Sequence, residues 1–166
     1  MTWLEMDETY MGGKYENMHA SKRARLGGRD TASKTPVWGA VERSGQVVAV
    51  TVANVDNVTL MPNVVKHVIP AATVCTDEMG AYKHLNKRGY NHKVITHAEQ
   101  VYVSGDVHTN TIEGFWSLVK RGIDGVYHNV SAKHLQSYLN EYAWRYNHRN
   151  GGRAMFETLL LRAVSR

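Results

Sequence analysis

The chain has 166 residues, 43% of them hydrophobic and 21% charged, which is the composition of one globular domain with a sizeable core and not that of a disordered chain. Its single cysteine, Cys75, excludes an intramolecular disulfide and a structural zinc site built from several thiolates, and no apolar run approaches the roughly 20 residues of a membrane-spanning helix. The N-terminus lacks the basic and apolar regions of a signal peptide, so we expect a soluble cytoplasmic protein with a formal net charge of +5.

The first predicted element is a strand over Trp3 to Tyr10, and a basic connection follows it. The stretch "TWLEMDETYMGG" starts with residues suited to a strand and ends in a turn signal, which places Asp7 in the strand or near its end. Segment 14–34 carries six Lys or Arg against two acids, has little apolar periodicity and contains a Gly-Gly pair, so it is predicted to be a long flexible loop. Such a loop either attracts a polyanion such as nucleic acid or only increases solubility.

A hairpin and a helix are predicted next. Two β-branched runs flank Ser44-Gly45 in "TPVWGAVERSGQVVAVTVAN", which is a strong hairpin signal. The stretch "VDNVTLMPNVVKHVIP" has apolar residues near helical spacing, and its Pro62 suits a helix only in the first turn.

A fourth and a fifth strand follow. The apolar run Ala72 to Thr76 predicts a strand that stops at Asp77 and passes into a helix reaching about Arg88, with Gly89 as the C-terminal stop. The stretch "HKVITH" predicts a short fifth strand. An acid such as Asp77, just past a buried strand and before a helix, occupies a common site position in α/β sheets.

The stretch "TNTIEGFWSLVKRG" predicts an amphipathic helix with two distinct faces. At roughly 100° per residue, one stripe is apolar and its neighbour is polar. The apolar stripe contains Ile112, Phe115, Trp116 and Val119, and the polar one contains Asn110, Glu113, Ser117 and Lys120. The polar face is either an ordinary solvated surface or a functional face presented by a helix that docks through its other side.

The C-terminal part predicts two more helices. One begins at Ser131, a good N-cap residue, carries a Leu/Tyr/Ala stripe and ends near Gly151-Gly152. The other covers Met155 to Val164. The order β-loop-β-β-α-β-α-β-α-α describes one α/β domain over residues 1–166, a mixed sheet with helices packed on it.

Three acids occupy comparable positions in this prediction. Asp7 lies on the first strand, Asp77 at the end of the fourth, and Glu113 on the helix after the fifth. Lys120 follows Glu113 by seven positions, which is two helical turns, so both side chains lie on the same face.

These positions lie in four sequence blocks that resemble a known family. The blocks are "MDETYMGGK", "TDEMGAYKHL", "HTNTIEGFWSLVKRGIDGVYHNVSAKHL" and "YLNEYAWRYNHRN". These blocks resemble the catalytic domain of bacterial insertion-sequence DDE transposases of the ISXO-like group. They occur in the order of that family and span nearly the whole chain. The resemblance implies an RNase H-like fold, with a five-stranded mixed sheet whose first three strands are antiparallel, flanked by helices. It also implies hydrolysis of a phosphodiester at a transposon end, followed by attack of the freed 3′-hydroxyl on target DNA.

The resemblance further implies that Asp7, Asp77 and Glu113 are catalytic metal ligands and that Lys120 contacts a DNA phosphate beside the third acid. Asp7 would bridge two Mg²⁺ ions, Asp77 would hold one and Glu113 the other, and Mn²⁺ is expected to substitute. Two divalent ions about 4 Å apart activate the attacking oxygen and stabilise the leaving oxygen, and such hard cations prefer carboxylate and water oxygens. Three neighbouring carboxylates repel one another without a cation, which is a further reason to expect metal.

Two residues near Glu113 have open roles. Related transposases carry either Glu or Asn as the third ligand, so Asn110, one turn earlier, either replaces Glu113 or supports it. His108, just before the helix, either approaches the scissile phosphate or is structural, and the other histidines lack the spacing of zinc ligands.

A set of basic residues is expected to contact DNA. Its members are Lys14, Lys22, Arg23, Arg25, Lys120, Arg121, Arg145 and Arg149. For Arg145 and Arg149 the alternative is a basic C-terminal turn favoured by the helix dipole.

The expected partner is double-stranded DNA, both transposon ends and target, bound by a homodimer or higher oligomer in the bacterial nucleoid. Such transposases usually carry a zinc-ribbon or helix-turn-helix region ahead of this domain, and we expect the present chain to lack that reader of transposon ends. Two other functions fit the pattern: an inactive DNA-binding remnant, and a metal-dependent nuclease without strand transfer. The intact acids argue against the remnant, because it has no physical reason to keep three repelling carboxylates.

Overall fold

The computed structural model describes residues 2–13, 19–26, 34–95, 107–127, 130–151 and 155–164, with the side chains of Lys22, Arg25 and Leu26 excepted. The strands are β1 (Trp3–Met11), β2 (Thr35–Glu42), β3 (Val47–Thr51), β4 (Thr73–Thr76) and β5 (Asn91–Val94). The α-helices are α1 (Ala20–Leu26), α2 (Asn57–His67), α3 (Asn110–Gly122), α4 (Ala132–Asn147) and α5 (Met155–Val164). No helix in the described ranges is both long and apolar enough to cross a membrane.

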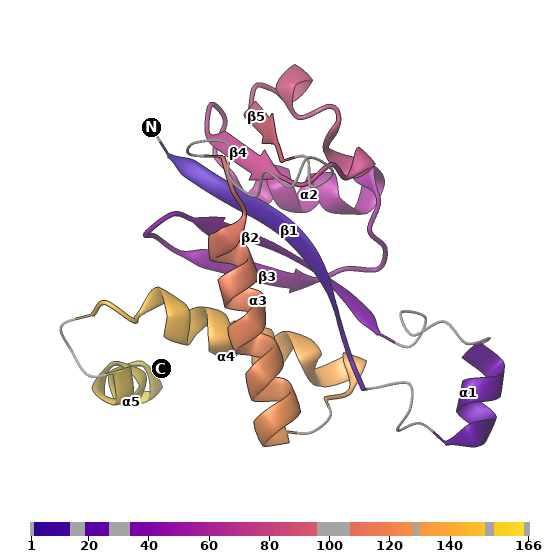
Figure 1. The fold of residues 1–166 in the computed structure, drawn as a ribbon. Coiled ribbons are helices and arrows are strands. Elements are labelled where there is room, and N and C mark those ends of the chain that lie inside the picture. The colour runs from indigo at the N-terminus through magenta and orange to yellow at the C-terminus, as the bar shows by residue number, and fades with distance from the viewer. Residues whose placement is uncertain are drawn as a thin grey trace.

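The five strands form one mixed sheet in the order β3-β2-β1-β4-β5 (Figure 1). β1, β2 and β3 pair antiparallel, whereas β4 pairs parallel to both β1 and β5. The β2–β3 hairpin turns through Ser44, whose φ of 61° is the left-handed conformation of a tight turn. This is the arrangement of an RNase H-like fold, and it confirms the predicted α/β class and strand directions.

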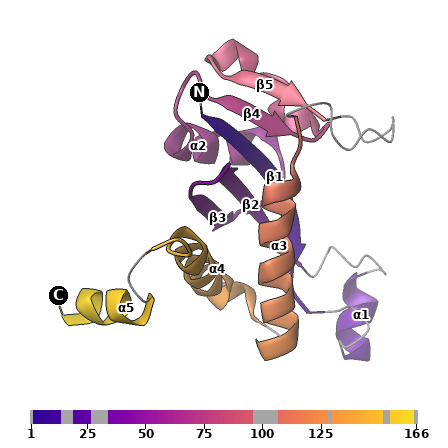
Figure 2. The ribbon, with the colours of Figure 1, turned by 60° about the vertical axis from the view of Figure 1, so that its left-hand side comes forward.

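Helices cover both faces of the sheet, and the alternation along β1 decides which residues face which helix. Leu4 and Met6 belong to the core cluster that also contains the buried side of α2. Glu5 and Asp7 point to the opposite face, because successive strand residues alternate, and α3 lies across that face. Figures 1 and 2 show α3 crossing β1 on one side of the sheet and α2 on the other.

The segment after Asp77 differs from the predicted helix. It forms two short 3-10 turns, Gly80–Tyr82 and Asn86–Arg88, and the chain then leaves through Gly89 at φ 87°. Tyr82 and Leu85 are both fully buried. Both side chains belong to the core cluster on the α2 side of the sheet, so the segment packs on the core without forming a continuous α-helix.

Two further corrections concern helices. Within the predicted loop 14–34, residues Ala20–Leu26 form α1, because Ala, Lys and Arg have high intrinsic helix propensity even without an apolar stripe. Pro62 is the sixth residue of α2 and so lies beyond its first turn. The carbonyl four residues earlier belongs to Val58, which is 84% exposed, so water can replace the hydrogen bond that Pro62 cannot donate.

The C-terminal helices agree with the prediction. α4 follows Ser131, which has the extended backbone of an N-cap residue although its side chain makes no capping hydrogen bond. Two amide side chains tie α4 to the edge strand β3: Gln136 bonds the backbone of Thr51 and Ala49, and Asn147 bonds that of Val47. α5 matches the predicted range and buries no residue.

Candidate active site

The sheet brings Asp7 and Asp77 together. In the parallel pairing of β1 with β4, Glu5 lies opposite Cys75. Continuing that register by two residues places Asp77 beside Asp7, and both side chains then point to the face that α3 covers. β4 ends at Thr76, and the Oδ1 atom of Asp77 accepts a hydrogen bond from the Met79 N–H at 3.0 Å, which orients the carboxylate in the turn.

Helix α3 contributes a donor to Asp7. The indole Nε1 of Trp116 donates to Oδ2 of Asp7 at 3.1 Å. This contact requires Gly39, which pairs with Asp7 across β1 and β2. A Cβ atom on Gly39 would lie 2.5 Å from a ring carbon of Trp116, so only glycine leaves room for the indole to reach the strand.

Glu113 lies one turn before Trp116 on the same helix. Its side chain is exposed, and its Oε1 atom accepts a hydrogen bond at 2.8 Å from the hydroxyl of Thr109, the residue preceding α3. The predicted apolar stripe, including Trp116, is buried, so the helix docks through that stripe and keeps Glu113 at the surface beside β1.

The pKa of Asp7 shows how crowded with negative charge this face is. Burial, and after it the charges of Asp77 and Glu113, raise that pKa, which is about 6 in all. Hydrogen bonds from the Glu8 backbone N–H and from Trp116 act in the opposite direction. No described Lys, Arg or His forms an ion pair with any of the three acids.

Glu8 lies on the opposite face of β1 from Asp7, because successive strand residues alternate. Sequence reasoning missed its burial. Neither carboxyl oxygen has a hydrogen-bond partner among the described residues. Burial, followed by the charges of Asp7 and Asp77, raises the pKa of Glu8 to about 8.

Glu5 is a second buried acid that sequence reasoning missed. It is fully buried and lies on the same face of β1 as Asp7, two residues earlier. Its carboxylate accepts hydrogen bonds from the backbone N–H groups of Thr111 and Ile112, at 2.7 and 3.1 Å, and from the Thr111 hydroxyl at 2.9 Å. Glu5 therefore caps the N-terminus of α3 from more than 100 residues away in the sequence.

Arg43, in the β2–β3 turn, completes this contact. Its Nε atom donates to Oε1 of Glu5 at 2.8 Å, and its NH2 group donates to the carbonyl oxygen of His108 at 3.1 Å. The Nδ1 atom of His108 lies 3.0 Å from the same Glu5 oxygen, without hydrogen-bond geometry. The available signal for Glu5 was a charged residue inside a predicted strand with apolar neighbours. Such a residue, if buried, needs a charged partner or hydrogen-bond donors.

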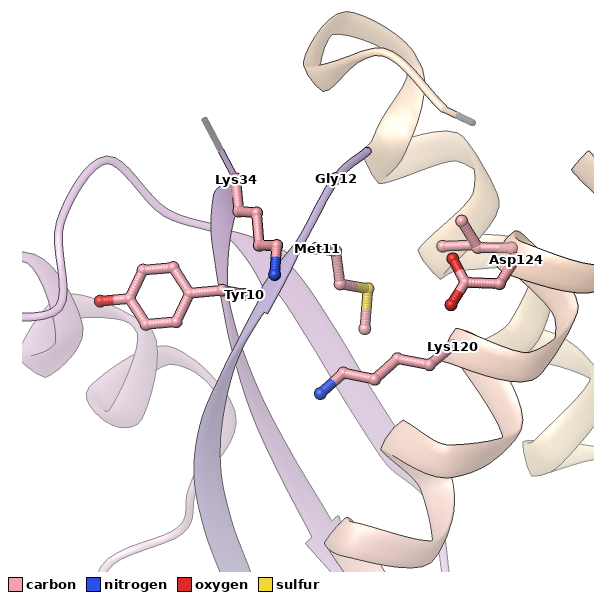
Figure 3. A pocket seen from close by; sticks show the side chains of 7 residues that line it. Tyr10, Met11, Gly12, Lys34, Lys120 and Asp124 are labelled. Carbon is pink, nitrogen blue, oxygen red and sulfur yellow. The ribbon is translucent and has the colours of Figure 1, made fainter. Parts of the chain in front are cut away.

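Lys120 lines a pocket of about 180 Å³ beyond the acids, between the end of β1 and the end of α3 (Figure 3). Its other lining residues are Tyr10, Met11, Gly12, Lys34, Ile123 and Asp124. Figure 3 shows the side chains of Lys34 and Lys120 entering this pocket from different elements, with Asp124 on another wall.

The sequence matches a known family over most of its length. A model of the ISXO2-like transposase domain matches residues 3–147, which include β1, β4 and α3 with their acids. The chain belongs to the ISXO2-like transposase family. This membership confirms the resemblance stated above, supports a transposase function and implies DNA binding.

Two relatives of this transposase domain carry related names. A transposase-like protein of Haemophilus influenzae is 30% identical over 102 residues, which are 61% of this chain and 81% of that protein. A protein in the transposable element ISH50 of Halobacterium salinarum is 33% identical over 94 residues, 55% of this chain and 32% of that protein.

The transposase domain does not present a ready-made metal cluster. Among the described residues, no three His, Cys, Asp or Glu side chains are grouped closely enough to hold an ion as they stand. Asn110 is exposed at the first position of α3, and His108 turns its ring toward Glu5. The role of each in ligation stays a prediction.

The other basic residues expected to contact DNA are distributed over the transposase domain. Arg121 is exposed on α3 and donates to the Ser117 carbonyl oxygen, and Arg23 is exposed on α1. Arg145 pairs with Glu141, and Arg149 stacks on the Tyr146 ring and bonds backbone oxygens. Lys14 and the side chains of Lys22 and Arg25 lie outside the described part of the chain.

Proposed function

We propose that this chain is the metal-dependent catalytic domain of a transposase, which cleaves phosphodiester bonds at transposon DNA ends and transfers the 3′-hydroxyl to target DNA. The observation that carries the proposal is the position of Asp7. The charges of two other acids, Asp77 and Glu113, act on it at the face where α3 crosses the strands, and no described cation balances them. Such a cluster is electrostatically unfavourable unless a cation completes it.

The residues fit Mg²⁺. All three side chains supply hard carboxylate oxygens, which Mg²⁺ and Mn²⁺ prefer. Among the described residues, the hydrogen bonds to Asp77 and Glu113 use one oxygen of each, and leave Oδ2 of Asp77 and Oε2 of Glu113 without a donor. In the proposed site Asp7, Asp77 and Glu113 would hold the metal ions.

Two bound ions supply activation of the attacking oxygen and stabilisation of the leaving oxygen. The chain's own contribution is orientation. Trp116 holds one oxygen of Asp7, the Met79 N–H holds Asp77 at the end of β4, and Thr109 holds Glu113. Each acid is thereby fixed by a donor from a different segment, so none must be ordered at the moment of reaction.

DNA would lie over the polar face of α3. Glu113 and Lys120 are both exposed on this helix, two turns apart, so a strand whose scissile phosphate lies near Glu113 passes Lys120. Double-stranded DNA is the proposed partner, and a dimer or higher oligomer would hold two transposon ends together.

The test is a reaction of the purified protein with DNA that carries the element's own ends, in Mn²⁺ and in Mg²⁺, followed by separation of nicked and joined products. We expect cleavage and joined product from the wild type, and neither from Asp77→Asn, with an unchanged circular dichroism spectrum. Nicked DNA without joined product would indicate a nuclease. DNA binding without any metal-dependent product would indicate an inactive remnant. Unchanged cleavage by Asp77→Asn would remove Asp77 from the site.

A further inference from the structure

The pocket beside Lys120 contains a second lysine that no part of the proposed site uses. Lys34 immediately precedes β2 and lines the same pocket as Lys120, which lies on α3. Tyr10 and Met11 supply the strand wall, and Asp124 lies on another wall (Figure 3). Among the described lining residues, two lysines and one aspartate give a formal charge of +1, which is the opposite of one phosphodiester.

The pocket lies in line with the acids along two elements. From Glu113 to Lys120, seven residues of helix span about 10 Å. From Asp7 to Tyr10 or Met11, three or four residues of strand span about 10 to 13 Å. Both routes therefore place the pocket about 10 to 13 Å from a phosphate bound at the acids, so the phosphate in the pocket would be a different one from the scissile phosphate.

We propose that Lys34 and Lys120 together bind one backbone phosphate of the DNA strand, about 10 to 13 Å from the bond that is cut. A volume of about 180 Å³ accommodates a phosphate group and not a whole nucleotide, so the pocket contacts the backbone and leaves the bases outside. The contact sets the register of the strand on the acids without reading its sequence. The position relative to the scissile bond rests on the proposed function, whereas the phosphate contact itself rests on the pocket alone.

The salt dependence of duplex binding tests this pairing. A fluorescein-labelled duplex of about 30 base pairs is titrated with the full chain in EDTA, at NaCl concentrations from about 50 to 200 mM, a range over which phosphate contacts strongly reduce affinity as salt rises. Each neutralised phosphate contributes about 0.9 to the slope of log K against log salt. We expect Lys34→Ala with Lys120→Ala to reduce the slope by about 0.9. The matched control is Lys66→Ala, an exposed lysine on α2, which covers the other face of the sheet.

The outcomes separate this inference from the proposed function. A reduction of about 1.8 in the double variant would mean two separate phosphates, and wild-type affinity of Lys34→Ala at every salt concentration would remove Lys34 from the contact. Either result overturns the shared site even if the wild type cuts and joins DNA. The expected slopes in a protein that never cuts DNA would instead leave the pocket in place and overturn the catalytic proposal.

A different observation, the burial of Glu5, carries a second inference. Glu5 and Asp7 leave the same face of β1 and engage successive turns of α3, Glu5 at Thr111 and Ile112 and Asp7 at Trp116. Two contacts along one helix fix both its position along the strand and its rotation about its own axis. Glu113 lies between these two attachment points.

We infer that Glu5 is a positioning residue that sets the distance of Glu113 from Asp7 and Asp77. Arg43 neutralises the buried Glu5 charge, and its bond to the His108 carbonyl oxygen holds the residue that leads into α3. The Thr111 and Ile112 N–H groups at the start of α3 point at Glu5, where a carboxylate also faces the positive end of the helix dipole. This inference rests on the proposed metal site.

The test uses Glu5→Gln, or the milder Thr111→Val if Glu5→Gln does not fold. The control is Glu141→Gln, which breaks the exposed pair with Arg145. Amide hydrogen exchange at Thr111 and Ile112 should accelerate by about 10- to 100-fold, the effect of losing a charged hydrogen bond. Mn²⁺ affinity, measured by electron paramagnetic resonance well below the melting temperature, should fall by about 10- to 100-fold, the usual effect of removing a group that orients metal ligands.

A purely structural role for Glu5 predicts a lower melting temperature with unchanged Mn²⁺ affinity in the folded variant, and that result would overturn the inference. Absence of Mn²⁺ binding by the wild type would count against the proposed metal site instead. Faster exchange confined to the start of α3 would then still locate the Glu5 contact. Exchange that is unchanged there would remove Glu5 as the attachment point of the helix.

Discussion

The indole N–H of Trp116 donates to Asp7 across 3.1 Å, so a residue of the apolar stripe of α3 also acts on the acid at the centre of the candidate site. Trp116 thus has two roles at once. Its ring system packs in the core over Gly39, and its one polar atom is directed at the strand. Packing of α3 on the sheet therefore also orients the Asp7 carboxylate.

Replacing Trp116 by Phe should raise the pKa of Asp7 above its value of about 6 in the metal-free protein. The indole hydrogen bond favours the ionised carboxylate, and its loss is worth on the order of one pH unit. Carboxyl-carbon NMR titration of Asp7 measures this directly. Trp144→Phe, on α4, is the control and should leave the titration unchanged. An equal Asp7 pKa in Trp116→Phe would show that the hydrogen bond does not form in solution.

Replacing Gly39 by Ala should destabilise the domain by about 1–3 kcal/mol, because the new Cβ would overlap the Trp116 ring. The matched control is Gly114→Ala on α3, where a Cβ would meet nothing within 4 Å. That substitution should stabilise the helix by about 0.5–1 kcal/mol. Chemical denaturation of both variants gives the two free energies of unfolding, and equal signs would contradict the packing described for Trp116.

Replacing Glu8 by Gln should make the stability of the metal-free domain less dependent on pH. The pKa of Glu8 is raised from 4.5 to about 8, so in this range the folded state binds a proton that the unfolded state has released. Stability from this group is complete below about pH 4.5 and is lost as the pH rises to about 8, with a slope of at most about 1.4 kcal/mol per pH unit.

The measurement is a series of thermal melts of wild type and Glu8→Gln in EDTA between about pH 5 and pH 8, the interval over which the two states differ in bound protons. The melting temperature of Glu8→Gln, relative to that of the wild type, should increase steadily as the pH rises. Parallel melting curves across this interval would mean that Glu8 is ionised in the folded protein.

Mg²⁺ should raise the melting temperature of the wild type by a few degrees, because an ion that binds only the folded state contributes roughly 1–3 kcal/mol at 10–100 times its dissociation constant. Asp77→Asn should lose this response. Without metal, the variant should be at least as stable as the wild type, since the charge of Asp77 opposes ionisation of Asp7. Asp56→Asn, which keeps a capping side chain on α2, is the control and should retain the Mg²⁺ response.

The local elements of this protein follow from its sequence because their signals are themselves local. Alternating β-branched residues, a turn at Ser44-Gly45 and the apolar stripe of α3 each depend on neighbours a few residues apart, and these elements form where the pattern predicts them. The choice of Asp7, Asp77 and Glu113 came from residue type, spacing and family resemblance. Family membership is confirmed, while the role of each acid stays a prediction.

The contacts between distant segments were decided by tertiary structure alone. Nothing local indicates that Glu5 caps a helix 106 residues away, that Gly39 clears space for Trp116, or that Lys34 shares a pocket with Lys120. The segment after Asp77, where a helix is predicted, forms two short 3-10 turns, with Tyr82 and Leu85 buried in the core. A pattern of residue types reports what each segment prefers, whereas the pairing of the strands and the crossing of α3 over β1 determine which of those side chains meet.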